Sequence, residues 1–290
     1  MVEGILVNGL IRGGVYALLA VGFSLIFGVA RMINLAHTCF YMLSAYGIYT
    51  FADLMGLNPV LAIIISLIAT TIIGLLTYKM FIDRIREHHV TVLLITLALA
   101  MVFQECMILG FGSHYLGAPS FIPGYAEILG VKVSYQHLLI FGVVLVVLLC
   151  VWALLSKTRL GIAIRATAQD PEVAGLMGIN VSRILLVTMG IAAALAAVAG
   201  IVVAPTLVLE PHMWTHPLIM IMAIVVLGGL GSVKGSFIAA FIIGFVEVLV
   251  VFLLPAGAFL KGAIALLVMV IVLLVRPEGL FGIAFEEERL

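Results

Sequence analysis

The sequence predicts an all-α, polytopic membrane protein, and two observations carry this prediction. The first is composition: 65% of the 290 residues are hydrophobic and only 10% are charged, whereas a soluble domain is about half apolar and about a quarter charged. The second is the recurrence, along the whole chain, of apolar stretches close to the roughly 20 residues that a helix needs to cross the hydrocarbon core. Because lipid cannot hydrogen-bond to the backbone, these stretches are expected to be helices.

Nine apolar segments are expected to form about eight to nine transmembrane helices in a single domain that spans residues 1–290. Two of the segments, 38–52 and 217–230, are short, so the number of crossings depends on whether they span. Two connections are long: 112–136 is rich in Gly, Pro and Tyr, and 156–184 carries several Arg and Lys residues. The nine segments are 13–30, 38–52, 59–80, 91–111, 137–155, 185–206, 217–230, 236–254 and 258–275.

The basic residues are distributed unevenly between the two sides of the predicted helices. If 156–184 lies in the cytoplasm, all of the 14 Lys and Arg residues except Arg12, Lys132 and Lys261 fall at or near the cytoplasmic side. Lysine and arginine favour that side of a membrane, so the asymmetry supports this orientation. It makes 112–136 an external loop and places the C-terminus in the cytoplasm, and nine crossings would put the N-terminus outside.

The two short segments each adjoin an irregular stretch that interrupts a helix. The first stretch contains Asn34 and His37, and the second is the run 228–232. Interrupted helices in matching positions of two halves point to a translocation pathway, because freed backbone groups are tolerated only against water, substrate or protein. We therefore expect both stretches to form the pathway, with these residues: Asn34, His37, Met42, Gly228, Gly229, Gly231 and Ser232.

Simpler interpretations of the same stretches remain open. The glycines of the second stretch also permit close helix packing, as in the patterns Gly9-x-x-x-Gly13 and Gly231-x-x-x-Gly235. Asn34 also fits a plain cap of a helix at the membrane interface, and the same holds for His37. These alternatives assign the stretches a structural role without a solute.

The basic connection has the pattern of a structured segment rather than of an ordinary loop. Residues 158–166 are basic and compatible with a helix. Asp170 then supplies an N-cap and Pro171 a first helical residue, while Gly178 is a C-terminal stop. The apolar residues between them give this short amphipathic helix a face that either docks on a partner protein or lies on lipid headgroups.

Three groups of residues resemble the LivH-type branched-chain amino acid permeases. In the first, 33–37 and 42–46 resemble the family's helix break, which reads roughly I-N-F-A-H-G and then M-x-G-A-Y. The second is similar to the family's cytoplasmic loop, which contacts the ATPase subunit: Arg159, Leu160, Gly161, Arg165, Ala166, Gln169, Asp170, Ala174, Gly178 and Ile179. The third resembles the family's second-half signature: 226–232, Gly235, Gly244 and Glu247. The groups occur in the right order and cover nearly the whole chain.

The resemblance implies an ABC importer permease fold with two related halves, in a prokaryotic plasma membrane. The implied function is ATP-driven import of branched-chain or hydrophobic amino acids, with this chain forming half of the pathway. The implied partners are a second permease subunit of the same or another kind, two cytoplasmic ATPase subunits, an extracytoplasmic substrate-binding protein and the lipid bilayer, without nucleic acid. The residues implied to couple to the ATPase are Arg159, Gly161, Arg165, Asp170, Ala174 and Gly178.

The chain itself is expected to be a transport subunit rather than an enzyme. The run 231–236 is the nearest to a phosphate-binding loop, but its spacing does not match Gly-x-x-x-x-Gly-Lys-Ser/Thr. ATP is therefore expected to be used by the partner subunit, and no cofactor is expected on this chain. Glu210, His212 and His216 fit a solvated external loop better than a metal site.

Three departures from the family pattern leave the substrate open. Thr38 and Cys39 stand where the family usually has Gly and an acidic residue, and Ser44 stands where it often has Gly. Because they adjoin the expected pathway, urea and short-amide permeases of the same superfamily remain alternatives. A stand-alone channel or ion-coupled carrier is another, since Glu105 and Glu247 lie in apolar runs, where ionisable groups are often functional; an interhelical hydrogen bond is the competing account.

Overall fold

The computed structural model describes residues 2–128 and 131–281, so the predicted cytoplasmic C-terminus lies outside the described residues. Each of the nine predicted apolar segments is helical. Short π-helical turns, Tyr49–Leu54 and Tyr78–Ile82, continue the second and third of these helices. The nine helices are α1 (Val2–Ala30), α2 (His37–Ile48), α3 (Pro59–Thr77), α4 (His89–Phe111), α5 (Tyr135–Lys157), α8 (Val181–Val203), α9 (Thr215–Gly228), α10 (Val233–Leu253) and α11 (Gly257–Val275).

The first helix is longer than predicted. We expected it to begin near residue 13, but α1 begins at Val2. Its first turns contain Asn8 and Arg12, polar residues that obscure an apolar pattern. These turns are helical because they pack on the end of α10, where Phe252 lies 3.5 Å from a Cβ built on Gly4; tertiary packing of this kind commonly overrides local preference.

Seven helices within the described residues are long and apolar enough to cross a membrane. The other two helices are shorter. α9 has 14 residues, about 21 Å at 1.5 Å per residue, and α2 has 12 residues before its π-helical end, whereas the hydrocarbon core is about 30 Å thick. The count by length and composition is therefore seven rather than the predicted eight to nine, and the helices beside the two breaks account for the difference.

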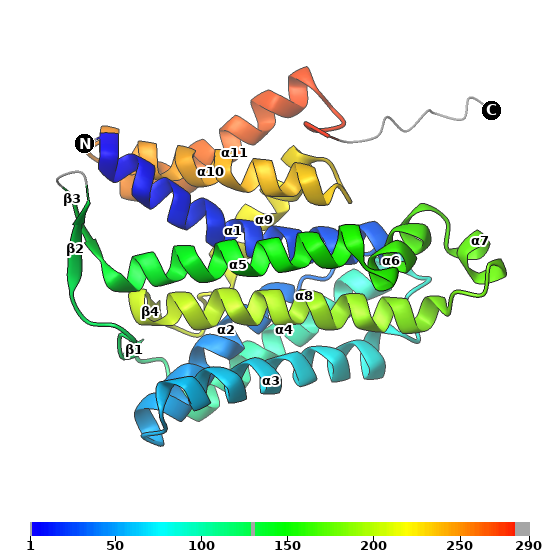
Figure 1. Ribbon diagram of the computed structural model, residues 1–290, viewed down its shortest axis with the longest axis horizontal. Coiled ribbons are helices and arrows are strands. Elements are labelled where there is room, and N and C mark those ends of the chain that lie inside the picture. Colours follow the sequence, from blue (N-terminus) through cyan, green and yellow to red (C-terminus); the bar gives the residue numbers. More distant parts are fainter. Residues whose placement is uncertain (1, 129–130, 282–290) are drawn as a thin grey trace.

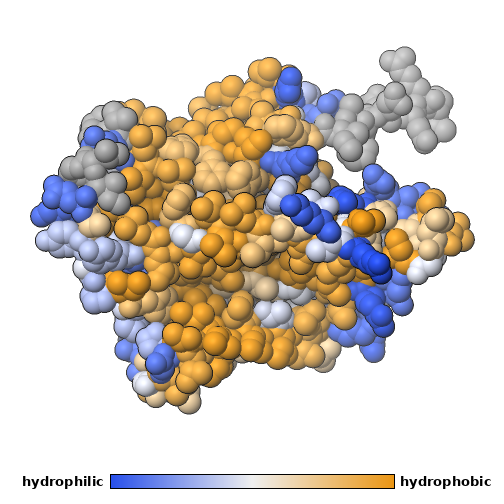
Figure 2. Space-filling model, viewed as in Figure 1, coloured by the Kyte–Doolittle hydropathy of each residue, from blue (hydrophilic) through white to orange (hydrophobic). Residues whose placement is uncertain are grey.

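The two long connections lie at opposite ends of the helix bundle (Figure 1). One end carries small antiparallel pairs that the all-α prediction did not include: β1 (Leu116–Gly117) with β4 (Val208–Leu209), and β2 (Tyr125–Ile128) with β3 (Val131–Ser134). The other end carries α6 (Arg159–Gln169) and α7 (Pro171–Leu176). Figure 2 shows hydrophobic residues across the middle of the surface and hydrophilic residues gathered toward both ends, the arrangement expected of a bundle that spans a bilayer.

α1 and α10 lie against each other in opposite directions, and glycines allow their close approach. A Cβ added at Gly9 would lie 2.3 Å from Phe245 Cδ1, and one at Gly13 would lie 3.0 Å from Phe241 Cα. A Cβ at Gly244 would lie 2.6 Å from Gly13 Cα. The distances at Gly9 and Gly244 are shorter than real Cβ contacts, and at Gly244 the atom met belongs to the backbone of α1, so a larger residue there would force the helices apart. Close packing, the simpler interpretation of Gly9-x-x-x-Gly13, is confirmed for this pair.

Substituting Gly244 by Ala should destabilise the protein by about 1–3 kcal/mol, because the added methyl group meets the backbone of α1 and the two helices must separate. The measurement is the thermal unfolding midpoint of the purified chain in detergent. The matched control is Gly142→Ala on α5, where an added Cβ meets nothing within 4 Å. Equal midpoints for the two variants would contradict the packing role.

Candidate functional site

The first break separates α1 from α2 by a sharp change of backbone direction. α1 ends at Ala30, and Arg31 has φ +50°, a left-handed conformation that is uncommon outside glycine. Asn34 then stabilises the start of α2, because its side-chain oxygen accepts a hydrogen bond from the Ala36 N–H at 3.1 Å. Asn34 is fully buried, and its bond to Ala36 is a local turn contact, since the N-cap of α2 is Ala36 and no side chain of the described residues caps this helix.

His37 connects the start of α2 to the middle of α1. Its Nε2 lies 3.1 Å from the carbonyl oxygen of Leu19; since a carbonyl only accepts, Nε2–H is the donor. The ring also meets the edge of Phe23, with ring centroids 6.0 Å apart. His37 is fully buried, as is Met42 farther along α2. The structure therefore places all three first-half candidates in the interior of the chain.

Several polar atoms at this break have no partner. Among the described residues, Asn34 Nδ2, His37 Nδ1 and Thr38 Oγ1 are buried and make no hydrogen bond. Buried polar groups in proteins are nearly always paired, so three free atoms on neighbouring residues mark an unusual site. These atoms are almost completely inaccessible in this structure, and the role of Asn34 and His37 in the pathway stays a prediction.

The second break is a tight link of glycines between α9 and α10. Gly229 and Gly231 have φ +99° and +82°, in the left-handed region that favours glycine. A Cβ at Gly228 would lie 2.4 Å from the carbonyl carbon of Gly235. Ser232 caps α10 by accepting a hydrogen bond from the Gly235 N–H at 3.1 Å. Each of these residues has a packing or capping role, and their pathway role also stays a prediction.

The second break contacts α1 just before the first break. A Cβ at Gly231 would lie 3.3 Å from Gly28 Cα, in the last turn of α1. The backbone groups that the break frees at the end of α9 are paired within the chain: Leu280 N–H donates to Leu227 O at 2.8 Å, and Phe281 N–H donates to Gly228 O at 3.1 Å. The carbonyl groups that the second break frees are therefore satisfied by the stretch that follows α11.

The predicted coupling segment forms two helices, as its pattern indicated. Asp170 caps α7 by accepting hydrogen bonds from the Glu172 and Val173 N–H groups at 2.9 and 3.0 Å. Gly178 has φ +86° and ends the segment, so the predicted cap and stop are confirmed. Ala174, in contrast, is only 4% exposed and faces the rest of the chain.

The residues at the start of the segment fix the corner between α5 and α6. A Cβ at Gly161 would lie 2.3 Å from Leu154 O, so only glycine fits where α6 turns back on α5. Arg165 donates a hydrogen bond to the carbonyl oxygen of Leu155. Arg159 is exposed on the first turn of α6. Gly161 and Arg165, both named from the resemblance, thus position the segment, whereas Arg159 faces outward.

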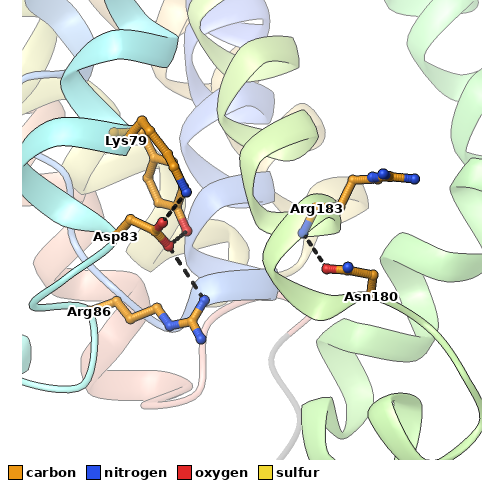
Figure 3. A network of polar contacts seen from close by, with 6 residues as sticks. Lys79, Asp83, Arg86, Asn180 and Arg183 are labelled. Atoms are coloured by element: carbon orange, nitrogen blue, oxygen red, sulfur yellow. Dashed lines mark hydrogen bonds and ion pairs between the residues drawn. The ribbon is translucent and has the colours of Figure 1, made fainter.

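A charged network lies at the same end of the bundle, between the end of α3 and the start of α8 (Figure 3). Asp83 is 2.7 Å from Lys79 Nζ and 3.7 Å from Arg86 Nη1. The hydrogen bond from Lys79 is the main reason that the pKa of Asp83 lies below its ordinary value. The Asp83 carboxylate therefore stabilises the fold at pH values above the ordinary Asp pKa, and this stabilisation is lost as the pH falls through the lowered pKa of Asp83. Across a pocket of about 260 Å³ lies Arg183. From the sequence, these basic residues predict only which side of the membrane is cytoplasmic.

The two intramembrane glutamates have different surroundings. Glu105 is exposed on α4, whereas Glu247 on α10 is fully buried. Glu247 Oε2 accepts hydrogen bonds from Arg12 Nη1 at 3.2 Å and from the Tyr16 hydroxyl at 2.9 Å. The interhelical hydrogen bond, the competing account for Glu247, is therefore confirmed. Sequence reasoning missed its partners, although Arg12 had stood out as a basic residue on the external side.

The chain is similar to known membrane permeases over its full length. The family model described as branched-chain amino acid transport system / permease component matches residues 5–273. The high-affinity branched-chain amino acid transport system permease protein BraD of Pseudomonas aeruginosa is 31% identical, over 96% of this chain and 94% of that protein. The corresponding protein LivH of Escherichia coli is 28% identical, over 95% of this chain and 94% of that protein.

A solved structure supports the same fold class. PsaBC from Streptococcus pneumoniae, in complex with a Fab, is similar with a TM-score of 0.50 and 17% sequence identity, over 93% of this chain and 90% of that chain. At this identity the likeness concerns the fold alone. The sequence match covers most of the chain, and the structure supplies the membrane-spanning helices that a transport subunit needs. The chain therefore belongs to the family of branched-chain amino acid transport permeases, and it is a multi-pass membrane transport component rather than an enzyme.

Proposed function

We propose that this chain forms half of the translocation pathway of an ATP-driven importer of branched-chain or other hydrophobic amino acids. The observation that carries the proposal is the full-length similarity to two relatives named as branched-chain amino acid permeases, at 31% and 28% identity. ATP is hydrolysed by separate subunits, and the complex works in a prokaryotic plasma membrane. This chain binds no cofactor of its own in the proposed cycle.

The proposed complex contains a second permease subunit, identical or related, two cytoplasmic ATPase subunits and an extracytoplasmic binding protein. The chain leaves surface for a second permease, because α3, α4, α5 and α11 bury at most 28% of their spanning windows. Lipid and the second subunit would cover these faces. In the proposed orientation, α6 and α7 face the cytoplasm, the four strands and the N-terminus face outside, and each of two related halves contains one short helix beside a break.

We propose that α7 docks in a cleft of an ATPase subunit. Leu176 and Met177 are 87% and 79% exposed, although they lie at a polar end of the bundle, and Val173 is 53% exposed. Exposed apolar residues that gather in this way are typical of protein contact sites. Ala174 faces inward, so it positions the helix, and Leu176 and Met177 form the contact.

The docking helix has a short connection to the first break. Arg31 begins the break, and its Nη2 donates a hydrogen bond at 3.3 Å to the carbonyl oxygen of Gln169, the last residue of α6. In the proposed mechanism, ATP-driven closure of the ATPases moves α6 and α7, and this contact transmits the movement to the end of α1. Rearrangement at the breaks then exposes the pathway to each side of the membrane in turn.

We propose that the first break contacts the solute. The free polar atoms of Asn34 and His37 would bind the polar groups common to all amino acids, and Met42 would contact the side chain. Buried hydrogen bonds discriminate between ligands more strongly than one methylene in an apolar pocket does. In this proposal the polar pair determines that an amino acid is accepted, and Met42 determines which size is preferred.

The proposed function predicts leucine uptake that requires ATP and every partner. Proteoliposomes with the assembled transporter should accumulate labelled leucine when the binding protein and internal ATP are present, and vesicles with this chain alone should not. Valine and isoleucine should compete, whereas urea and acetamide should not. Uptake by this chain alone would instead identify a stand-alone carrier, and competition by urea would favour the amide-transporting alternative.

Replacing Leu176 by Asp should uncouple the transporter, because a carboxylate in an apolar docking contact loses its hydration. Leucine uptake should fall at least about tenfold, equivalent to about 1.4 kcal/mol, while the chain still inserts and the ATPases still hydrolyse ATP. Leu176→Met, which keeps the residue apolar, is the matched control and should transport normally. Normal uptake by the Asp variant would show that α7 does not dock through this residue.

Replacing Asn34 or His37 by Ala should reduce the uptake of leucine, valine and alanine to the same extent, by at least about tenfold. Met42→Ala should instead change the ratio of leucine to alanine uptake. The control is Thr71→Ala, because the Thr71 hydroxyl bonds only to Leu67 O in its own helix. Rates are compared at equal amounts of folded transporter, and uptake that is indifferent to both polar substitutions would contradict the pathway assignment.

A further inference from the structure

A cavity of about 670 Å³ lies where α10 ends and α9 and α11 begin, at the end of the bundle that carries β4. Ile11, Val15 and Ile140 contribute apolar walls, and Arg12, Lys261, Glu247 and Glu210 contribute charged groups. Small-molecule sites are commonly cavities of about 300–1,000 Å³ with apolar walls and a few placed polar groups. Of the described residues, those that line this cavity do not include the pathway candidates of the two breaks.

The carboxylate of Glu247 is only partly satisfied by the chain. Its side chain is 1% exposed, and Oε2 receives both the Arg12 and the Tyr16 hydrogen bonds. Oε1 has no hydrogen-bond partner among the described residues, and His216 Nε2 lies 3.6 Å from it, beyond hydrogen-bond distance. A buried oxygen without a donor costs free energy, so a ligand that brings N–H groups to Oε1 would recover it.

The same cavity offers positive groups. Arg12 uses one nitrogen on Glu247, and its guanidinium carries further N–H donors on a side chain that is 40% exposed. Lys261, from α11, lines the cavity as well, and it makes no ion pair with another of the described residues. Charged groups within apolar helices are costly and usually mark a ligand or ion site. An ion pair that served only to hold α1 against α10 would require neither Lys261 nor a free carboxylate oxygen.

We propose that this cavity binds the zwitterionic head of an amino acid, with the ammonium group on Glu247 Oε1 and the carboxylate on Arg12 and Lys261. The aliphatic side chain lies against Ile11, Val15 and Ile140. This inference rests on the proposed function and deepens it, because it places an amino acid site on the permease itself. The ligand needs both an ammonium and a carboxylate group, since Glu247 contacts only the first and Arg12 and Lys261 contact only the second.

The test measures binding to the permease–ATPase complex in nanodiscs without the binding protein, so that recognition by the binding protein does not contribute. The ligands are leucine, leucinamide, which lacks the carboxylate, and 4-methylpentanoate, which lacks the ammonium group. In the wild type, removing either group should weaken binding at least about tenfold. In Lys261→Met, leucine should keep only part of its advantage over leucinamide, because Arg12 still contacts the carboxylate; in Glu247→Gln, leucine and 4-methylpentanoate should bind almost equally. A variant that failed to fold would instead lose all three ligands.

Two further variants separate recognition from helix packing. Lys132→Met removes an exposed lysine of β3 outside the cavity and should leave leucine binding unchanged. The exchange of Arg12→Glu with Glu247→Arg keeps an ion pair between α1 and α10, so the complex should melt near the wild-type temperature but bind leucine at least about tenfold more weakly. Leucine binding by the exchange variant at wild-type strength would overturn the proposal, as would the absence of leucine binding to the wild type. ATP-driven uptake with the binding protein present would in either case test the proposed function separately.

Discussion

The contact between α1 and α10 is the constraint on which the rest of the structure depends. Helices in lipid gain little from hydrophobic burial against each other, so their association depends on close packing of small residues and on polar contacts. This contact supplies both. Toward one end it brings Arg12 to Glu247, and toward the other it brings the last turn of α1, at Gly28, against Gly231 in the link before α10. A change of register by one helical turn would separate both pairs, so the cavity and the breaks are positioned by the same interface.

The two breaks differ in how their backbone and side-chain groups are satisfied. The carbonyl groups freed at the second break accept hydrogen bonds from Leu280 and Phe281 of the same chain. At the first break, Asn34 and His37 each make one hydrogen bond and keep one polar atom free. Because free buried polar atoms are costly, the first break gains more from a polar solute or from water. The glycines of the second break are explained by packing, which leaves Asn34 and His37 as the stronger pathway candidates.

The features that could be predicted from the sequence are those with local causes. Long apolar stretches identify the nine helices, and the Asp170 cap and Gly178 stop depend only on residues within a few positions. The other features depend on partners far away in the chain. Arg12 and Glu247 are 235 positions apart, so the sequence indicated that Glu247 needs a partner without indicating which one. The pairing of β1 with β4, which places Leu116 opposite Leu209, and the helical start of α1 likewise form against distant segments, and their own residues carry no strong pattern.

α1 connects the two regions to which the proposed mechanism assigns a role. It has 29 residues, about 43 Å in length. At one end Arg31 contacts Gln169, the last residue of α6, and near the other Arg12 holds Glu247 at 3.2 Å. That distance is at the long end of the usual range, so a displacement of about 1 Å would weaken the bond and change the charges that the cavity offers to a ligand. In the proposed mechanism, a movement of α6 and α7 would therefore have a direct route to the cavity. Because coupling between binding sites is reciprocal, a ligand between Arg12 and Glu247 would in turn bias the position of α1 at the end where α6 and α7 lie.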